Sequence, residues 1–206
     1  EKIDPVRFIG NYSSGKMGYA LAEECAARGA EVTLVSGPVT LQVNHPNIRR
    51  IDVESAGEMH EAAREAFADA HAGILCAAVA DFTPAHTAEQ KIKKQVGQTT
   101  MTIEMSCTTD IAATVGKQKR KEQTLVGFAL ETHNELNNAQ RKLTSKHLDM
   151  IVLNSLQDAG AGFGTDTNKV TLLFSDGTQK NLPLISKEEA ADAIIDSTES
   201  LALQSI

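Results

Sequence analysis

Apolar and polar positions along the first eighty residues predict helices and strands in alternation. Residues 17–28 place apolar or small side chains on one helical face, and Gly29 follows where a left-handed residue can end a helix. The pattern then predicts a strand at 32–36 and an extended segment at 49–53. The apolar run 74–80 is typical of a buried parallel strand.

Two helix starts are marked by capping boxes, in which a serine and a glutamate three residues later each satisfy a backbone N–H of the other. Ser55 and Glu58 predict a helix that runs to about Ala70. Ser186 and Glu189 predict the start of a final helix.

The middle of the chain continues the alternation. Apolar residues alternate at 100–105, and we expect a helix at 110–117, a buried strand at 125–129, an amphipathic helix at 135–146 and a strand at 150–153. The fold class that accounts for this order most simply is α/β. We expect a Rossmann-like, doubly wound, mostly parallel sheet with helices on both faces.

The tail departs from this order. Segments 169–174 and 178–182 flank Ser175-Asp176-Gly177, and an Asp-Gly turn between extended segments predicts a C-terminal β-hairpin. Segments 81–99 and 154–168 remain unassigned. Long segments without regular structure in a compact domain are usually functional or mobile.

Length and composition favour one globular domain that spans residues 1–206. Hydrophobic residues make up 41% of the chain and charged residues 23%, which excludes disordered and collagen-like classes. The longest apolar run, 73–80, is far shorter than the roughly 18 residues of a membrane span, so we expect no membrane partner.

Charge and cysteine content narrow the partners and the compartment. Twenty Lys and Arg against 27 Asp and Glu give a net charge of −7, which disfavours a general nucleic-acid surface. Cys25, Cys76 and Cys107 are odd in number and form no C-x-x-C pair, so neither a disulfide framework nor a zinc site is indicated. We expect a cytoplasmic protein.

The segment Gly10-Asn11-Tyr12-Ser13-Ser14-Gly15-Lys16 fits the P-loop spacing G-x-x-x-x-G-K before a predicted helix. Met17 breaks the match, because a P-loop places Ser or Thr there as a ligand of Mg²⁺. An ordinary glycine-rich turn is the alternative. The asparagine, the serines and the lysine favour a site for an anion or a carboxylate.

Several further residues have the chemistry of a nucleotide site, although each also has an ordinary structural explanation. Residues 91–94, Lys-Ile-Lys-Lys, form either solvated surface or a cationic lid over a polyphosphate. Lys142 and Lys146 share a helix face and can add two charges. Phe128 and Asp81 each end a predicted strand, where open α/β sheets bind ligands.

Collinear motifs across essentially the whole chain closely resemble the bacterial phosphopantothenoylcysteine synthetase family. Met17, which spoils the P-loop match, is part of the family pattern. The motifs that carry the resemblance are Asp4-Pro5-Val6-Arg7-Phe8-Ile9, Asn11-Tyr12-Ser13-Ser14-Gly15-Lys16-Met17-Gly18, Ala77-Ala78-Val79-Ala80-Asp81-Phe82, Lys91-Ile92-Lys93-Lys94 and Gly127-Phe128-Ala129-Leu130-Glu131-Thr132.

The resemblance implies a phosphopantothenate–cysteine ligase of coenzyme A biosynthesis that works with Mg²⁺. The carboxylate of phosphopantothenate attacks the α-phosphate of CTP and releases pyrophosphate. The amine of cysteine then attacks the acyl-cytidylate and releases CMP. In most bacteria such a domain is fused to a flavin decarboxylase, whose FMN belongs to that other half, and the family acts as a homodimer.

The resemblance also implies site residues, by position in this sequence. Asn11 and Lys91 are expected to be catalytic, Arg7, Asn11 and Ala78 to face phosphopantothenate and the acyl-cytidylate, and the metal ligands stay unassigned. The residues expected to bind CTP are Ala77, Asp81, Lys91, Thr109, Asp110, Ile111, Ala112, Phe128, Lys142 and Lys146.

Two departures from the family bear on these expectations. The family commonly has Asn-Pro where this chain has Thr108-Thr109. The family's first strand and a Gly-Pro-Thr turn precede the segment that begins at Glu1, so we expect a central strand to be missing from the sheet. We also expect residues 163–168 and the following hairpin to help form a dimer interface.

Two other function classes stay open from the residues themselves. The glycine-rich loop and the strand that ends at Asp81 are compatible with a P-loop-like nucleotide hydrolase. The same features are compatible with a nucleotide-binding module that catalyses nothing. The reaction products separate the three, because a P-loop enzyme makes a nucleoside diphosphate and a binding module releases nothing.

Overall fold

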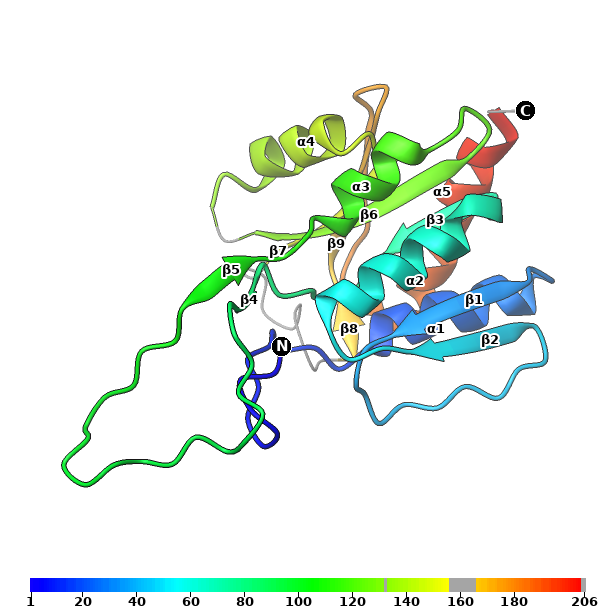
Figure 1. Ribbon diagram of the computed structural model, residues 1–206. Coiled ribbons are helices and arrows are strands. Elements are labelled where there is room, and N and C mark those ends of the chain that lie inside the picture. The colour runs from blue at the N-terminus through cyan, green and yellow to red at the C-terminus, as the bar shows by residue number, and fades with distance from the viewer. Residues whose placement is uncertain (132, 156–165, 205–206) are drawn as a thin grey trace.

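A computed structural model describes residues 1–131, 133–155 and 166–204 of the chain (Figure 1). Helices and strands alternate through most of it, as the sequence predicts. The elements are α1 (Lys16–Ala27), β1 (Val32–Ser36), β2 (Ile48–Asp52), α2 (Ala56–Asp69), β3 (Ala72–Leu75), β4 (Phe82–Pro84), β5 (Met105–Cys107), α3 (Ile111–Gln118), β6 (Thr124–Glu131), α4 (Glu135–Ser145), β7 (Met150–Ser155), β8 (Thr167–Asn168), β9 (Val170–Phe174), β10 (Gln179–Asn181), β11 (Ile185–Ser186) and α5 (Lys187–Gln204).

The largest sheet has five strands in the order β10-β9-β7-β6-β3. Strands β3, β6 and β7 run parallel, with Val126 opposite Met150 between β6 and β7. The hairpin β9–β10 adds two antiparallel strands at one edge, where Met150 lies opposite Phe174. The predicted fold class is therefore confirmed as α/β with a mostly parallel central sheet.

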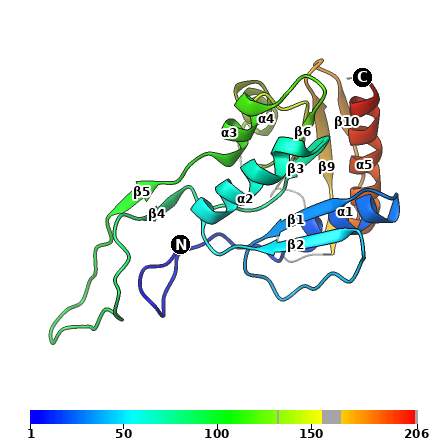
Figure 2. The same cartoon turned by 45° about the vertical axis from the view of Figure 1, so that its right-hand side comes forward.

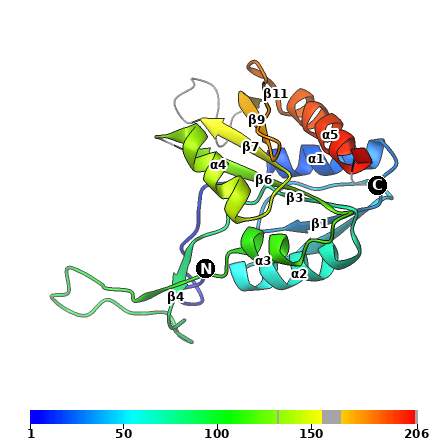
Figure 3. The same ribbon diagram turned by 90° about the horizontal axis from the view of Figure 1, so that it is seen from above.

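Helices cover both faces of this sheet (Figure 3). On one face α1 and α5 enclose a core that includes Val126, Val152 and Ile194, all fully buried. On the other face α2, α3 and α4 enclose a second core that includes Val115 and Leu143. Adjacent residues of one strand thus point into different cores, which fixes the register of the sheet.

Arg28 ties α1 to α5 at the edge of the first core. Its guanidinium pairs with a carboxylate of α1 and with three carboxylates of α5, at N–O distances of 2.5 to 3.1 Å, from Glu24, Asp192, Asp196 and Glu199. This network joins the end of α1 to α5.

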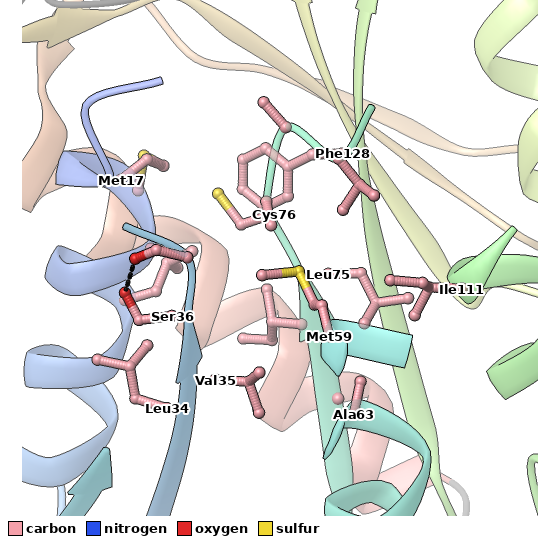
Figure 4. Close-up of a pocket in the computed structure, with 18 of the residues that line it drawn as sticks. Met17, Leu34, Val35, Ser36, Met59, Ala63, Leu75, Cys76, Ile111 and Phe128 are labelled. Atoms are coloured by element: carbon pink, nitrogen blue, oxygen red, sulfur yellow. Dashed lines mark hydrogen bonds between the residues drawn. The ribbon is translucent and has the colours of Figure 1, made fainter. Parts of the chain in front are cut away.

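Strands β1 and β2 form a separate parallel pair (Figure 2). Strands β1 and β3 border a slot that is part of a cavity of about 2290 Å³. Figure 4 shows Leu34 and Val35 of β1 on one side of this slot, and Leu75 together with Met59 and Ala63 of α2 on the other. The sheet is therefore interrupted between β1 and β3, and the expectation that a strand preceding Glu1 belongs there stays a prediction.

Local signals in the sequence are confirmed at several element boundaries. Both capping boxes form, and in the second the N–H of Glu189 donates to Ser186 Oγ over 3.1 Å. Gly29 follows α1 with a φ of +92°, and Gly177 turns the β9–β10 hairpin with a φ of +87°. These are left-handed conformations that glycine adopts without a steric penalty.

One predicted strand is wrong in extent, and the alternating segment 100–105 is mostly irregular. The strand predicted at 74–80 is β3, which ends at Leu75, because the carbonyl oxygens of Val79 and Ala80 accept side-chain donors instead of ladder partners. Residues 100–105, where apolar residues alternate, are irregular up to β5, which pairs with β4 at the base of a long excursion over residues 85–104 (Figure 1).

Among the helices of the described residues, none combines the length and the apolar composition that crossing a membrane requires.

Candidate functional site

Most of the predicted site residues line the cavity around the carboxyl ends of β3 and β6. These ends meet the loop that precedes α1 and the start of α3, although the residues come from segments far apart in the sequence. The predicted residues that line the cavity are Asn11, Ala77, Ala78, Asp81, Thr109, Asp110, Ile111, Ala112, Phe128, Lys142 and Lys146.

The loop before α1 is fastened to the chain that follows β3 by one side chain. Asn11 Nδ2 donates to the backbone oxygen of Val79 over 3.0 Å. This bond fixes the amide of Asn11 at the segment that contains Ala77 and Ala78. Asn11 is exposed, so its remaining amide N–H and its oxygen are accessible to a ligand in the cavity.

The start of α3 is fastened to the same segment. Thr108 donates from its hydroxyl to the backbone oxygen of Ala80 over 2.7 Å and from its N–H to the oxygen of Asp81 over 2.9 Å. Asp110 then caps α3, because its Oδ1 accepts the N–H of Ala113 over 2.9 Å. Thr108 therefore ties the start of α3 to the segment that follows β3.

Two lysines from the end of α4 reach the cavity, and each carries an acidic partner. Lys146 Nζ lies 2.9 Å from Asp110 Oδ2, and Lys142 Nζ lies 2.6 Å from Glu131 Oε1. The predicted sharing of one helix face by these lysines is thus compatible with the structure. A phosphate that binds either lysine has to displace the carboxylate that pairs with that lysine.

The pKa of the Asp110 carboxyl reflects this position. Partial burial works to raise it, but the hydrogen bond from the N–H of Ala113 and the ammonium of Lys146 outweigh burial and lower it below its ordinary value. Asp110 is therefore ionised at neutral pH and holds the Lys146 ammonium at the start of α3.

Phe128 and Cys76 lie near Met17 of α1 at one end of the cavity (Figure 4). Both pack against the core that includes Met17. Burial raises the pKa of the Cys76 thiol to about 12, so this cysteine is a neutral packing residue and no nucleophile at neutral pH.

Two predicted site residues are not among those that line the cavity. Lys91 is exposed on the excursion between β4 and β5, and Arg7 binds Asp4 and the backbone of Ile92. Their expected contacts with CTP and phosphopantothenate stay predictions.

The structure adds Lys187, which the sequence did not single out, and Asn168, which the sequence places only in the expected dimer interface. Lys187 is buried at the start of α5, where burial and the nearby Lys16 lower its pKa. Asn168 is 3% exposed, and its Oδ1 has no hydrogen-bond partner among the described residues. Because Lys187 directly follows the capping serine, the sequence indicates only a helix start there.

The described residues contain no group of three or more His, Cys, Asp or Glu side chains arranged to hold a metal ion. Mg²⁺ is usually bound through one or two carboxylates together with the phosphates of a substrate. Asp81, exposed at the rim of the cavity, supplies one such carboxylate. The site thus fits an ion that is delivered with a nucleotide.

The chain matches a family model described as DNA/pantothenate metabolism flavoprotein C-terminal domain over residues 1–201. It is 47% identical to the coenzyme A biosynthesis bifunctional protein CoaBC of Bacillus subtilis, over 99% of this chain and 50% of that protein. It is 56% identical to a cysteine/cysteine sulfinic acid decarboxylase of an unknown prokaryotic organism, over 95% of this chain and 54% of that protein.

A solved structure is also similar. The crystal structure of the C-terminal domain of a CoaBC bifunctional protein superimposes with a TM-score of 0.82 at 41% identity, over 99% of this chain and 91% of that one. The chain spans about half the length of the curated relatives it matches. The similarity therefore concerns one domain of those longer proteins.

Proposed function

The chain belongs to the family of the DNA/pantothenate metabolism flavoprotein C-terminal domain, and on that premise we propose that it is a phosphopantothenate–cysteine ligase of coenzyme A biosynthesis. The single observation that carries the proposal is the set of contacts that joins Asn11 and the start of α3 to the segment after β3, and Lys146 to Asp110, in the lining of one cavity. Ligands of open α/β sheets bind at such ends.

In the first step a carboxylate oxygen of phosphopantothenate attacks the α-phosphorus of CTP. The bond to the bridging oxygen breaks, and pyrophosphate leaves. Negative charge gathers on the transferring phosphates, where preorganised cations lower the barrier. Lys142 and Lys146 provide two such cations at the cavity, and Lys91 is the third that we propose.

In the second step the amine of cysteine attacks the acyl carbon, the bond from that carbon to the CMP oxygen breaks, and an amine proton is lost. Oxyanion charge develops on the acyl oxygen, which needs a hydrogen-bond donor. The amide of Asn11 is oriented by Val79 and is the donor that we propose. Arg7 and Ala78 complete the proposed contacts with phosphopantothenate and the acyl-cytidylate.

Mg²⁺ would supply charge neutralisation on the phosphates of the bound nucleotide. Asp81 would hold it from the protein side, since its carboxylate lies at the cavity rim. The choice of CTP over ATP rests on the resemblance to the bacterial family, and we place the base near Ala77 and Phe128.

We also propose that the domain acts as a homodimer. Residues 163–165 of the expected interface lie outside the described residues, and the neighbouring edge strand β10 is exposed. Several large apolar side chains are exposed as well, including Phe8, Tyr12 and Phe82. A second copy of the chain that covers these side chains would explain why they are exposed in one copy. Light scattering that gives the mass of one chain at micromolar concentration would contradict the dimer.

The experiment that tests the function is product analysis after incubation with CTP, phosphopantothenate, cysteine and Mg²⁺. The ligase produces CMP and pyrophosphate in equal amounts, together with phosphopantothenoylcysteine. A P-loop hydrolase produces CDP and phosphate, and a binding module produces nothing. The name of the 56% identical relative makes carbon dioxide from cysteine the further product to measure, and its release without pyrophosphate would overturn the ligase.

A further inference from the structure

The side chain of Asp4 is completely buried beside the long excursion between β4 and β5, and its carboxylate receives several hydrogen bonds. Within its own segment, Asp4 Oδ1 accepts the N–H groups of Val6 and Arg7, each over 2.9 Å. Asp4 Oδ2 accepts Nε of Arg7 over 3.0 Å and also pairs with a terminal guanidinium nitrogen of that arginine. The N-terminal segment therefore forms a tight turn around one buried charge.

The same two side chains hold a residue almost ninety positions away. The N–H of Ile92 donates to Asp4 Oδ2 over 3.1 Å, and the guanidinium of Arg7 donates to the backbone oxygen of Ile92 over 2.8 Å. Both backbone groups of Ile92 are thus occupied by an ion pair. Lys91 is the residue directly before it.

Two further bonds fasten the start of this excursion to the N-terminal segment. The N–H of Ala88 donates to the oxygen of Ile3 over 2.9 Å, and Thr87 Oγ1 donates to the oxygen of Lys2 over 3.1 Å. These contacts do not involve Asp4 or Arg7. They offer a way to loosen the excursion without touching the ion pair.

Electrostatics make the contact to Ile92 dependent on both partners. The Arg7 guanidinium, together with the backbone donors, holds the pKa of the Asp4 carboxyl far below its usual range, so Asp4 is ionised at neutral pH. The carboxylate has no exposed surface and depends on its donors, whereas the side chain of Arg7 is 40% exposed. Removing the Asp4 charge takes away the ionic acceptor that Arg7 shares with the N–H of Ile92.

We propose that Asp4 and Arg7 form a clasp on Ile92 that positions Lys91 for the activation step, an inference that rests on the proposed function of Lys91. Asp4 touches no reacting atom in this account and is a positioning residue. Arg7 has two proposed roles. Its guanidinium binds Asp4 and the backbone oxygen of Ile92, and it is also expected to face phosphopantothenate. The alternative is that the clasp only stabilises the fold.

The first test is independent of catalysis and uses hydrogen exchange of the chain without ligand. In Asp4→Asn the amide of Ile92 loses a charged acceptor, so its exchange should quicken at least about tenfold while the helices keep their protection. Asp176→Asn is the matched control, because Asp176 also accepts from backbone and side chain but lies in the β9–β10 turn. Unchanged exchange at Ile92 overturns the clasp.

If Asp4→Asn fails to fold, Arg7→Lys tests the same contact, because lysine keeps the positive charge but lacks the fork that bridges Asp4 and Ile92. Thr87→Val loosens the excursion at another point. Exchange at Ile92 should quicken in Arg7→Lys and stay close to the parent in Thr87→Val. Equal effects of the two variants would overturn a specific clasp.

The second test is a double-mutant cycle on pyrophosphate release. Asp4→Asn should slow release at least about tenfold in the parent, and should cause no further loss in Lys91→Gln, because a positioning residue acts only through the residue it positions. Additive losses would show a general structural role and overturn the positioning of Lys91. If the parent releases no pyrophosphate, the proposed function fails, while the exchange experiment still decides the clasp.

Discussion

Gly116 of α3 packs directly against the backbone of Lys146 at the end of α4. A β-carbon built on Gly116 would lie 1.9 Å from the carbonyl oxygen of Lys146 and 2.9 Å from its carbonyl carbon. No side chain can give way there, because both atoms belong to the backbone. The close contact sets where α4 ends relative to the start of α3, and therefore where the Lys146 ammonium meets Asp110.

We therefore expect Gly116→Ala to destabilise the domain by about 2–3 kcal/mol and to weaken nucleotide binding, since α3 and α4 have to move apart. Thermal unfolding and CTP titration measure the two effects. Gly57→Ala is the control, because a β-carbon there meets only Ser55 Oγ at 3.9 Å. A Gly116→Ala protein with parental stability would contradict the contact.

Asn11→Asp should leave the domain folded but impair the second step of the reaction. The carboxylate cannot donate to Val79 or to an acyl oxygen, and it repels the phosphates of the intermediate. We expect amide formation to fall about 10²–10³-fold, the loss typical of one missing oxyanion donor. Rapid-quench measurement of CMP release reports it, and exposed Asn44→Asp serves as the control. Normal acyl transfer with weakened CTP binding would show that Asn11 has another role.

Lys146→Gln should weaken CTP binding about tenfold, the typical contribution of a charged hydrogen bond to a phosphate. Its ion pair with Asp110 is partly exposed, so the free energy of unfolding should change by less than about 1 kcal/mol. Isothermal titration at two salt concentrations measures the loss, and the variant should depend less on salt. Lys117→Gln, exposed on α3 and outside the cavity, should bind CTP like the parent. Equal affinity of both variants would remove Lys146 from the site.

The slot between β1 and β3 predicts that a preceding strand completes the sheet. A strand parallel to both neighbours would end at the edge where Glu1 accepts the N–H of Ala56 at the start of α2. Fusion of the family's first strand to Glu1 should raise the melting temperature by about 10 °C, since several apolar side chains become buried. A glycine–serine extension of equal length is the control. Equal melting temperatures for the two extensions would contradict this prediction.

Local signals explain which elements the sequence predicts well. The Ser186–Glu189 capping box and the Asp176-Gly177 turn depend on residues a few positions apart, and the structure confirms both. The end of β3 does not depend on local signals. Beyond its end, the carbonyl oxygens of Val79 and Ala80 accept from Asn11 and Thr108, and neither contact is evident from an apolar run.

In the candidate site, too, local spacing predicts some features, and contacts between distant segments determine the others. The spacing of Lys142 and Lys146 predicts that both reach one surface, which the cavity lining supports. Lys142 pairs with Glu131 at the end of β6, and Lys146 pairs with Asp110 at the start of α3. Sequence spacing carries no information about these two contacts. The burial of Lys187 is likewise set by distant neighbours, so the sequence indicates only the beginning of α5.

The measurement that tests the proposed function most directly follows the carboxylate oxygen that attacks the α-phosphorus. Phosphopantothenate labelled with oxygen-18 in its carboxylate is incubated with CTP, cysteine and Mg²⁺, and the products are analysed by mass spectrometry. If the carboxylate attacks the α-phosphorus, one labelled oxygen appears in CMP and none in pyrophosphate. CMP without label, or label in inorganic phosphate, would contradict the acyl-cytidylate and with it the account of the site.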